Sequence, residues 1–189
     1  MAHNVGFALC GSFCTFSSVI PRIEELRKSG TEIFPVMSYN AYSIDTRFGK
    51  ANEHNDRIEE ICERKIIHTL TDAEPIGPKK LIDALIIAPC TGNTLAKLAA
   101  GIADTPVTLA AKSCLRNGCP VIIAVSTNDA LSNAAKNIGL LMNMKNIYFV
   151  PLRQDDHKNK PTSVVADFSK IRETYLEAIE HRQIQPVIL

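Results

Sequence analysis

The sequence has 189 residues, a mass of 20.8 kDa and a net charge of +1, with 21 Lys and Arg against 20 Asp and Glu. Its 46% of hydrophobic and 22% of charged residues are typical of a globular chain, which excludes disordered and fibrous classes, and this length suits one domain. The balanced charge lacks the basic excess of nucleic-acid binders, and the apolar runs are shorter than the ~20 residues that a membrane helix needs.

Predicted strands alternate with predicted helices along the chain. The expected strands are residues 5–10, 31–37, 85–88, 120–125 and 147–150. The expected helices are residues 18–28, 55–64, 94–102, 106–116, 130–137 and about 163–182, followed by a short tail at 183–189. Pro35 predicts an edge position or a strand end, because proline cannot donate a ladder hydrogen bond. We therefore expect residues 1–189 to form a single α/β domain, Rossmann-like or flavodoxin-like, with a doubly wound, mostly parallel sheet and helices on both faces.

The loops that follow the expected strands carry small polar residues. In a sheet of this kind, ligands bind beyond the carboxyl ends of the strands. The loops in question contain Gly11-Ser12, Ser38, Thr91-Gly92-Asn93-Thr94 and Ser126-Thr127-Asn128. Helix capping explains any one of these loops. Four such loops at one edge of the sheet favour a ligand that carries phosphate, because hydroxyls and the N–H groups at helix starts bind phosphate.

The first loop, Gly11-Ser-Phe-Cys-Thr-Phe, matches neither G-x-G-x-x-G nor G-x4-G-K-[ST]. Phe13 stands where a dinucleotide needs close backbone approach to its pyrophosphate. A dinucleotide site and a nucleoside-triphosphate hydrolase are both disfavoured. A mononucleotide flavin, with one phosphate and no pyrophosphate, suits the loops better.

The six cysteines are spread along the chain, several within apolar runs. This distribution predicts reduced, buried thiols in a cytoplasmic protein rather than a disulfide framework. Cys10 and Cys14 are spaced C-x3-C without a second ligand pair, and no metal site is expected. Cys14 and Cys90 lie on the expected cofactor loops, where a reactive thiol is one alternative and a small core-filling residue the favoured one. The N-terminus has no charged n-region or cleavage site of a signal peptide.

Residues 88–104, Ala-Pro-Cys-Thr-Gly-Asn-Thr-Leu-Ala-Lys-Leu-Ala-Ala-Gly-Ile-Ala-Asp, resemble a family signature. It is the P-A-S-A-N-T-x-x-K-x-A-x-G-x-x-D motif of the flavoprotein family, which contains flavin-dependent cysteine decarboxylases and their prenyltransferase relatives. Val36-Met-Ser38-x-x-Ala41 resembles the phosphate-binding second loop of that family. Ser126-Thr-Asn128 stands where the decarboxylase branch has P-A-M-N. The resemblance covers essentially the whole chain.

The resemblance implies a Rossmann-like fold, FMN bound near a subunit interface, and a homo-oligomer. Carried over by position, Ser12 and Ser38 would hold the FMN phosphate, and Asn128 would face the substrate. The full set of expected cofactor-binding residues is Gly11, Ser12, Phe13, Ser38, Pro89, Thr91, Gly92, Asn93, Thr94 and Ser126.

Two departures from the family pattern bear on the chemistry. The catalytic histidine of the decarboxylase branch is replaced by Glu74-Pro75, and His68 lies upstream in a different phrase. The proline of P-A-M-N is replaced by Val125-Ser126. Decarboxylation of a peptidyl cysteine is therefore not expected, and the sequence identifies no catalytic residue.

Four phrases, at residues 46–49, 74–79, 126–131 and 154–156, resemble one branch of the family. That branch implies a subunit that acts with a separate A subunit, which would bind NAD(P). The pair would oxidise a dihydro- or tetrahydropyridine dicarboxylate to pyridine-2,6-dicarboxylate during sporulation. Asn128, Lys158 and Lys160 are the candidate clamp for this small dicarboxylate, with a solvated charged loop as the alternative for the lysines. A stand-alone FMN-dependent decarboxylase or flavin prenyltransferase, and a non-catalytic scaffold, remain open.

Overall fold

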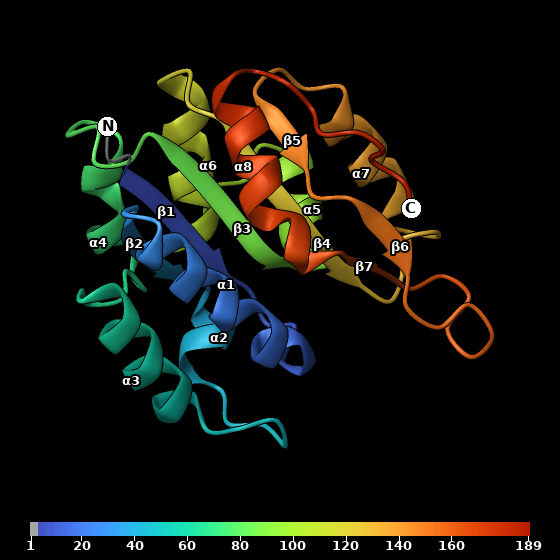
Figure 1. The fold of residues 1–189 in the computed structure, drawn as a ribbon, viewed down its shortest axis with the longest axis horizontal. Coiled ribbons are helices and arrows are strands. Elements are labelled where there is room, and N and C mark those ends of the chain that lie inside the picture. The colour runs from blue at the N-terminus through green and yellow to red at the C-terminus, as the bar shows by residue number, and fades with distance from the viewer. Residues whose placement is uncertain (1–3) are drawn as a thin grey trace.

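The computed structural model describes residues 4–189, and Figure 1 shows their fold. The strands are β1 (Asn4–Leu9), β2 (Glu32–Met37), β3 (Ala84–Cys90), β4 (Val121–Thr127), β5 (Ile147–Phe149), β6 (Leu152–Gln154) and β7 (Val164–Ala166). The α-helices are α1 (Phe16–Lys28), α2 (Tyr39–Ser43), α3 (Ala51–Cys62), α4 (Leu70–Ala73), α5 (Gly92–Ala99), α6 (Pro106–Arg116), α7 (Ala135–Met142) and α8 (Ile171–Ile179). Among these residues, no helix is long and apolar enough to cross a membrane.

Within the described residues the strands form one seven-stranded sheet in the order β2-β1-β3-β4-β7-β6, with β5 paired to β4. The pairs β1–β2, β1–β3, β3–β4 and β4–β5 are parallel, whereas β7 runs antiparallel to β4 and to β6. The predicted mostly parallel, Rossmann-like sheet is confirmed. β2 lies at one edge, as Pro35 predicts.

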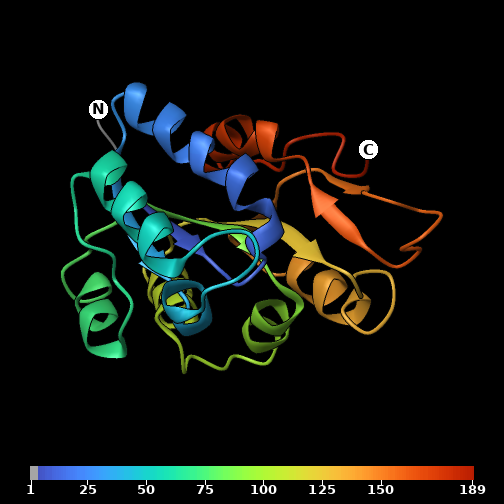
Figure 2. The ribbon, with the colours of Figure 1, turned by 90° about the horizontal axis from the view of Figure 1, so that it is seen from below.

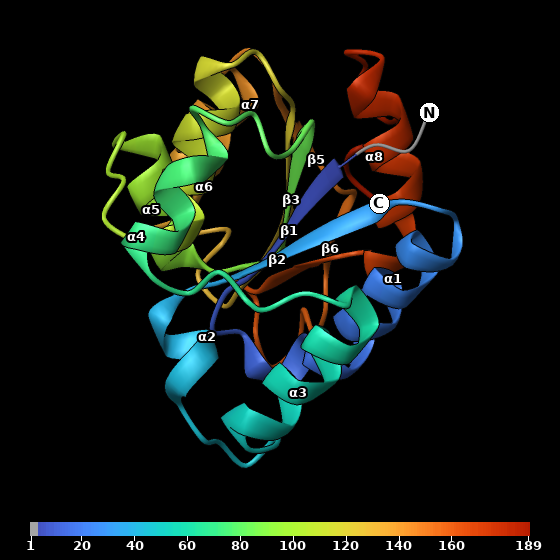
Figure 3. The same cartoon turned by 90° about the vertical axis from the view of Figure 1, so that its left-hand side faces the viewer.

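Helices cover both faces of this sheet. Figures 2 and 3 show α1 and α8 on one face, with α3 beside α1, and α5, α6 and α7 on the other. The central strand β3 is buried along its whole length, and β1 and β4 are buried at all but one terminal residue each. Strands covered on both sides carry unbroken apolar runs, which is why residues 84–90 and 121–125 contain almost no polar side chain.

Two predicted helices are wrong in position. The helix expected at residues 130–137 is α7, which begins only at Ala135, because the carbonyl of Asp129 accepts hydrogen bonds from the N–H groups of Ser132 and Ala134 and holds turns there. The final helix expected at about 163–182 is α8, which spans only Ile171–Ile179.

The residues before α8 form other structure. β-branched Val164 and Val165 pair with β6 and with the end of β4 as strand β7. The side chain of Asp167 then accepts a hydrogen bond from the Ser169 N–H at 3.1 Å and caps a 3-10 turn at Phe168–Lys170. Helices α2 and α4 and strand β6 were not predicted, and α3 begins earlier than the helix expected at residues 55–64.

Candidate functional site

A cavity of about 970 Å³ opens at the carboxyl edge of β1, β3 and β4, where the loops after these strands meet. Its size lies within the range of small-molecule and cofactor sites, roughly 300–1,000 Å³. Most of the residues expected from the sequence line it, namely Gly11, Ser12, Phe13, Thr91, Gly92, Asn93, Ser126, Asn128 and Lys160. The structure therefore brings together the polar loops after β1, β3 and β4. Asn128 and Lys160 of the candidate clamp lie in the same cavity.

Two serine hydroxyls join the loops after β1 and β4. The Oγ atoms of Ser12 and Ser126 lie 2.8 Å apart and share a hydrogen bond across the cavity wall. The N–H of Ser12 donates to the carbonyl of Cys10 at 2.8 Å, and the hydroxyl of Thr15 donates to the carbonyl of Ser12 at the same distance. These bonds fix the turn before α1, so that Ser12 presents its hydroxyl toward the cavity rather than to the helix.

Gly92, the first residue of α5, lies against the loop after β4. A Cβ atom at this position would stand 2.8 Å from Thr127 Oγ1 and 2.9 Å from Asp129 Oδ1, closer than real Cβ contacts allow. The hydroxyl of Thr127 itself donates to Asp129 Oδ1 at 2.6 Å. Glycine is required here because only a residue without a side chain lets the two loops approach this closely.

The start of α5 offers polar groups to the cavity. Thr91 is the N-cap residue, but its side chain makes no capping hydrogen bond to the helix N–H groups. Its hydroxyl instead lies 3.3 Å from that of Thr94. Uncapped N–H groups at a helix start carry partial positive charge and bind anions. Asn93 adds an amide to the same rim.

Of the charged side chains that line the cavity in the described residues, one lysine and one aspartate form an ion pair and a second aspartate does not. Lys160 Nζ lies 3.4 Å from Asp155 Oδ2, and both residues belong to the segment between β6 and β7. Burial alone would raise the pKa of Asp155, but hydrogen bonds from Ser163, the backbone and Lys160 together lower it. Asp129, the other carboxylate of the cavity, forms no ion pair within residues 4–189. The side chains of Asp129, Asp155 and Lys160 thus leave the cavity with excess negative charge.

Four expected site residues do not line the cavity. Ser38 lies at the start of α2, where its hydroxyl accepts a hydrogen bond from the N–H of Ala41 at 3.3 Å. Lys158 is exposed on the segment between β6 and β7. Pro89 and Thr94 lie behind the cavity wall.

Pro89 and Thr94 both contact Cys10 at the end of β1. Pro89 is buried in β3, and its carbonyl accepts a hydrogen bond from the Cys10 N–H at 3.2 Å. The buried hydroxyl of Thr94 donates to Cys10 Sγ at 3.2 Å. In this structure both residues therefore position the cavity-lining loops, and their predicted contact with a cofactor remains a prediction.

Several cavity residues were not among the site residues predicted from the sequence, although Cys14 and Thr127 lie on loops that were. They are Cys14, Thr46, Phe48, Ala96, Thr127, Asp129, Asn133, Ala134, Asn137, Asp155, Ser163 and Val165. The phrase Thr46-Arg-Phe-Gly was available as a signal, because it resembles a branch of the family, and the structure places Thr46 and Phe48 at the cavity. The phrase at residues 154–156 was a similar signal for Asp155, whereas no motif pointed to Ser163.

The cysteines differ in environment. All six are free thiols, and Cys10, Cys62, Cys90 and Cys114 are buried, as predicted. Burial raises the pKa of Cys10 to about 11. The core-filling role expected of Cys14 is wrong, because this thiol is exposed on the cavity. A hydrogen bond from the neighbouring Cys114 thiol lowers the pKa of Cys119 to about 7.

Comparison with known proteins places this chain among flavoproteins. It is 44% identical over 186 residues to the B subunit of dipicolinate synthase from Bacillus subtilis (strain 168), covering 98% of this chain and 93% of that protein. The crystal structure of the dipicolinate synthase B subunit from Bacillus halodurans matches with a TM-score of 0.91 and 42% identity, covering 100% of this chain and 98% of the other. The FMN-dependent cysteine decarboxylase SpaF matches with a TM-score of 0.68 and 25% identity, covering 93% and 97%. The Flavoprotein family model matches residues 1–178, and the chain belongs to the Flavoprotein family.

Proposed function

We propose that this chain is the B subunit of a dipicolinate synthase and that its cavity binds FMN. With a separate A subunit it would oxidise a dihydro- or tetrahydrodipicolinate precursor to dipicolinate, pyridine-2,6-dicarboxylate, in the cytoplasm of a sporulating bacterium. The observation that carries the proposal is the cavity itself, built from hydroxyl and amide residues at the carboxyl edge of the sheet in a chain 44% identical to such a subunit.

The residues around the cavity suit FMN. The hydroxyls of Ser12 and Ser126, with the uncapped start of α5, offer donors for one phosphate, and Asn93 offers an amide to the ribityl chain. Gly92 lets the start of α5 lie against the loop after β4, so that the two loops form one continuous wall. Phe13 supplies an aromatic ring on the same wall, suited to a flat ring system. When bound, FMN would supply a hydride acceptor, which an aromatising dehydrogenation requires.

The substrate clamp is proposed at the rim formed by the segment between β6 and β7. The carbonyl of Asn128 accepts a hydrogen bond from the Thr162 hydroxyl at 2.7 Å, which ties that segment to the loop after β4. Lys160 lines the cavity, and Lys158 lies on the same segment. We propose that Asn128 and the two lysines hold the carboxylates of the substrate and so orient its ring.

The loop after β1 indicates which of the two subunits would bind which cofactor. Phe13 occupies the position where a dinucleotide pyrophosphate would need close backbone approach, and no G-x-G-x-x-G follows β1. We assign NAD(P) to the A subunit and the flavin site to this chain. A homo-oligomer of this chain, combined with A subunits, is part of the proposal.

Two measurements test the proposed function. Purified protein should carry a flavin absorption band, or acquire one with added FMN, and release FMN on denaturation. Formation of dipicolinate from freshly generated precursor, followed by the ultraviolet absorbance of the product, should require both subunits and NAD(P). A protein that ignores FMN but stimulates the A subunit would identify a scaffold. Full activity of either subunit alone would contradict the two-subunit assignment.

A further inference from the structure

The carboxylate of Asp129 is held in a fixed position by the loop after β4. Its Oδ1 atom accepts a hydrogen bond of 2.6 Å from the hydroxyl of Thr127, two residues earlier. Its backbone carbonyl accepts from the N–H groups of Ser132 at 3.0 Å and Ala134 at 3.1 Å, which anchors the turn before α7. A half-buried side chain constrained at both ends in this way has little freedom to rotate into solvent.

This carboxylate faces the cavity opposite the start of α5. Gly92 is so close that a Cβ atom there would come within 2.9 Å of Asp129 Oδ1. The same glycine and the same carboxylate both line the cavity. Gly92 and Asp129 therefore lie against each other in one wall of the cavity, and the carboxylate reaches a ligand from that wall.

Asp129 is the unpartnered base of the cavity. Asp155, the second carboxylate there, is paired with Lys160 at 3.4 Å, and Lys160 is the one cationic side chain lining the cavity within residues 4–189. In the same part of the chain, Asp129 Oδ2 accepts no hydrogen bond, and no histidine lines the cavity. A hydrogen-bond donor on a ligand in the cavity would therefore find Asp129 Oδ2 available as an acceptor.

We propose that Asp129 is the general base for ring oxidation, accepting the proton that a dihydropyridine dicarboxylate loses together with a hydride. The role rests on the proposed function of this chain. In the step, a ring C–H bond breaks and its hydrogen leaves with both electrons to the oxidised flavin. The bond between a second ring atom and its hydrogen breaks, its electron pair remains in the substrate, which becomes the aromatic pyridine, and the proton forms an O–H bond with Asp129 Oδ2. The substrate loses two electrons and two hydrogens, and the flavin gains the two electrons.

The decisive variant is Asp129→Asn, which keeps the shape of the side chain and an oxygen for the Thr127 hydroxyl but cannot accept the proton. The complex of both subunits, loaded with FMN and kept free of oxygen and NAD(P), is mixed with dihydrodipicolinate, and loss of the visible flavin band is followed in a single turnover. We expect this rate to fall at least about 100-fold, the usual contribution of a general base. Asp56→Asn is the matched control, because it removes one carboxylate from the exposed face of α3, outside the cavity.

Two binding measurements accompany the rate. Affinity for FMN should change less than about threefold in Asp129→Asn, whereas affinity for pyridine-2,6-dicarboxylate should rise, because a negative charge beside a dianion has been removed. Wild-type rate with unchanged product affinity would overturn the role of Asp129 alone. Loss of FMN binding would identify Asp129 as a cofactor ligand and overturn it as well. Failure of the wild-type complex to reduce its flavin would instead overturn the proposed function. If Asp129→Asn does not fold, Asp129→Ser serves the same comparison.

Discussion

The hydroxyls of Ser12 and Ser126 lie 2.8 Å apart although 114 residues separate them in the chain. Ser12 follows β1 and Ser126 lies near the end of β4, two strands that flank β3 and run parallel to it. The parallel order brings the carboxyl ends of these strands to one edge, and the pair of hydroxyls marks the place where the loops converge. An anionic group seated there would meet both hydroxyls, one of which has its proton free while the other donates across the pair.

Ser12→Asp should abolish FMN binding and leave the fold intact. The new carboxylate would replace a donor with a negative charge beside Ser126 and repel a phosphate. We expect affinity for FMN to fall at least about 100-fold, or about 2.7 kcal/mol. Flavin fluorescence titration gives the affinity, and circular dichroism reports the fold. The matched control is Ser17→Asp, the same change at an exposed position in α1 outside the cavity. Equal affinity in Ser12→Asp and wild type would refute the phosphate assignment.

Gly92→Ala should weaken both the fold and cofactor binding. The added methyl group would stand 2.8 Å from Thr127 Oγ1 and force the loops after β3 and β4 apart. Overpacking of this kind costs about 1–3 kcal/mol, measurable by urea unfolding. Gly139→Ala is the contrast, since Gly139 lies in α7 with open space around it. That change should stabilise the protein by about 0.5–1 kcal/mol. A stable Gly92→Ala variant with normal FMN affinity would show that the loops are not in contact there.

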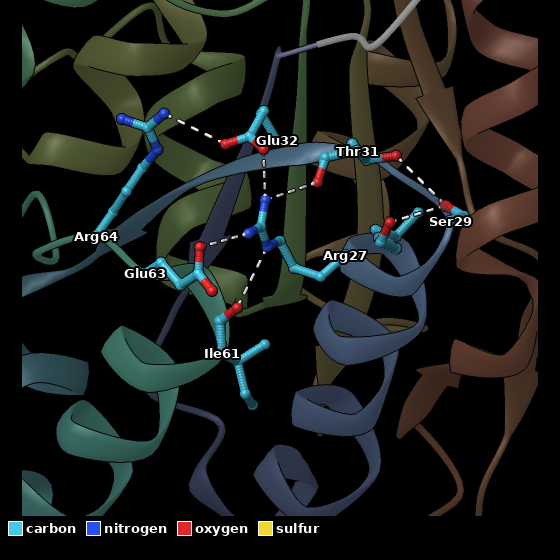
Figure 4. Close-up of polar contacts among 8 residues, drawn as sticks. Arg27, Ser29, Thr31, Glu32, Ile61, Glu63 and Arg64 are labelled. Carbon is cyan, nitrogen blue, oxygen red and sulfur yellow. Dashed lines mark hydrogen bonds and ion pairs between the residues drawn. The ribbon is translucent and has the colours of Figure 1, made fainter.

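Arg27 joins α1 to β2 and to the end of α3 through the polar contacts that Figure 4 shows. From the last turn of α1 its guanidinium donates to Glu32 in β2 at 2.8 Å and to Glu63 after α3 at 3.1 Å. Arg64 donates to the other oxygen of Glu32 at 3.3 Å. Hydrogen bonds from Arg27 and then Arg64 lower the pKa of Glu32 below its ordinary value of 4.5.

Removing Arg27 should therefore reduce the acid sensitivity of the protein. A carboxyl group whose pKa is lower in the folded state stabilises the fold above its unfolded pKa, and this stability is lost as pH falls through the folded value. In Arg27→Gln the pKa of Glu32 moves back toward 4.5, so the fall in unfolding free energy below that pH should be shallower than in wild type. Urea unfolding across this range measures it. Arg22→Gln, which breaks an exposed pair with Glu25 in α1, is the control. Parallel pH profiles for wild type and Arg27→Gln would contradict the assignment.

Native thiol labelling should separate the six cysteines into two groups. Cys14 is exposed and Cys119 is partly exposed with a pKa lowered to about 7, so both should react with an alkylating reagent near neutral pH. Burial raises the pKa of Cys62 to about 12 and that of Cys90 well above its ordinary value. These two thiols and the other buried ones, Cys10 and Cys114, should stay unmodified until the protein unfolds.

FMN distinguishes the two reactive thiols. Cys14 lines the cavity whereas Cys119 does not, so bound FMN should protect Cys14 and leave the labelling of Cys119 unchanged. Peptide mass spectrometry after short labelling times gives the result for each site. Equal protection of both residues would indicate a change of the whole fold, and protection of neither would place the flavin away from the first loop.

The sequence by itself determined the elements whose signal is local. The apolar runs of β1, β3 and β4 predicted the buried centre of the sheet, and Pro35 predicted an edge strand, because backbone chemistry and a run of apolar side chains act over a few residues. The polar residues that follow those strands predicted the cavity, since parallel strands deliver their carboxyl ends to a common edge.

Only the tertiary structure decided the remaining features. Val164 and Val165 form a strand rather than the start of a helix, because the exposed ends of β4 and β6 offer them hydrogen-bonding partners that no local pattern reveals. Lys160 lies in the cavity and Lys158 outside it, although only Asn159 lies between them, because that segment closes on the loop after β4 through Thr162 and Asn128. Asp129 lies against Gly92 of a distant loop for the same reason, because packing between segments, not sequence order, sets which residues meet.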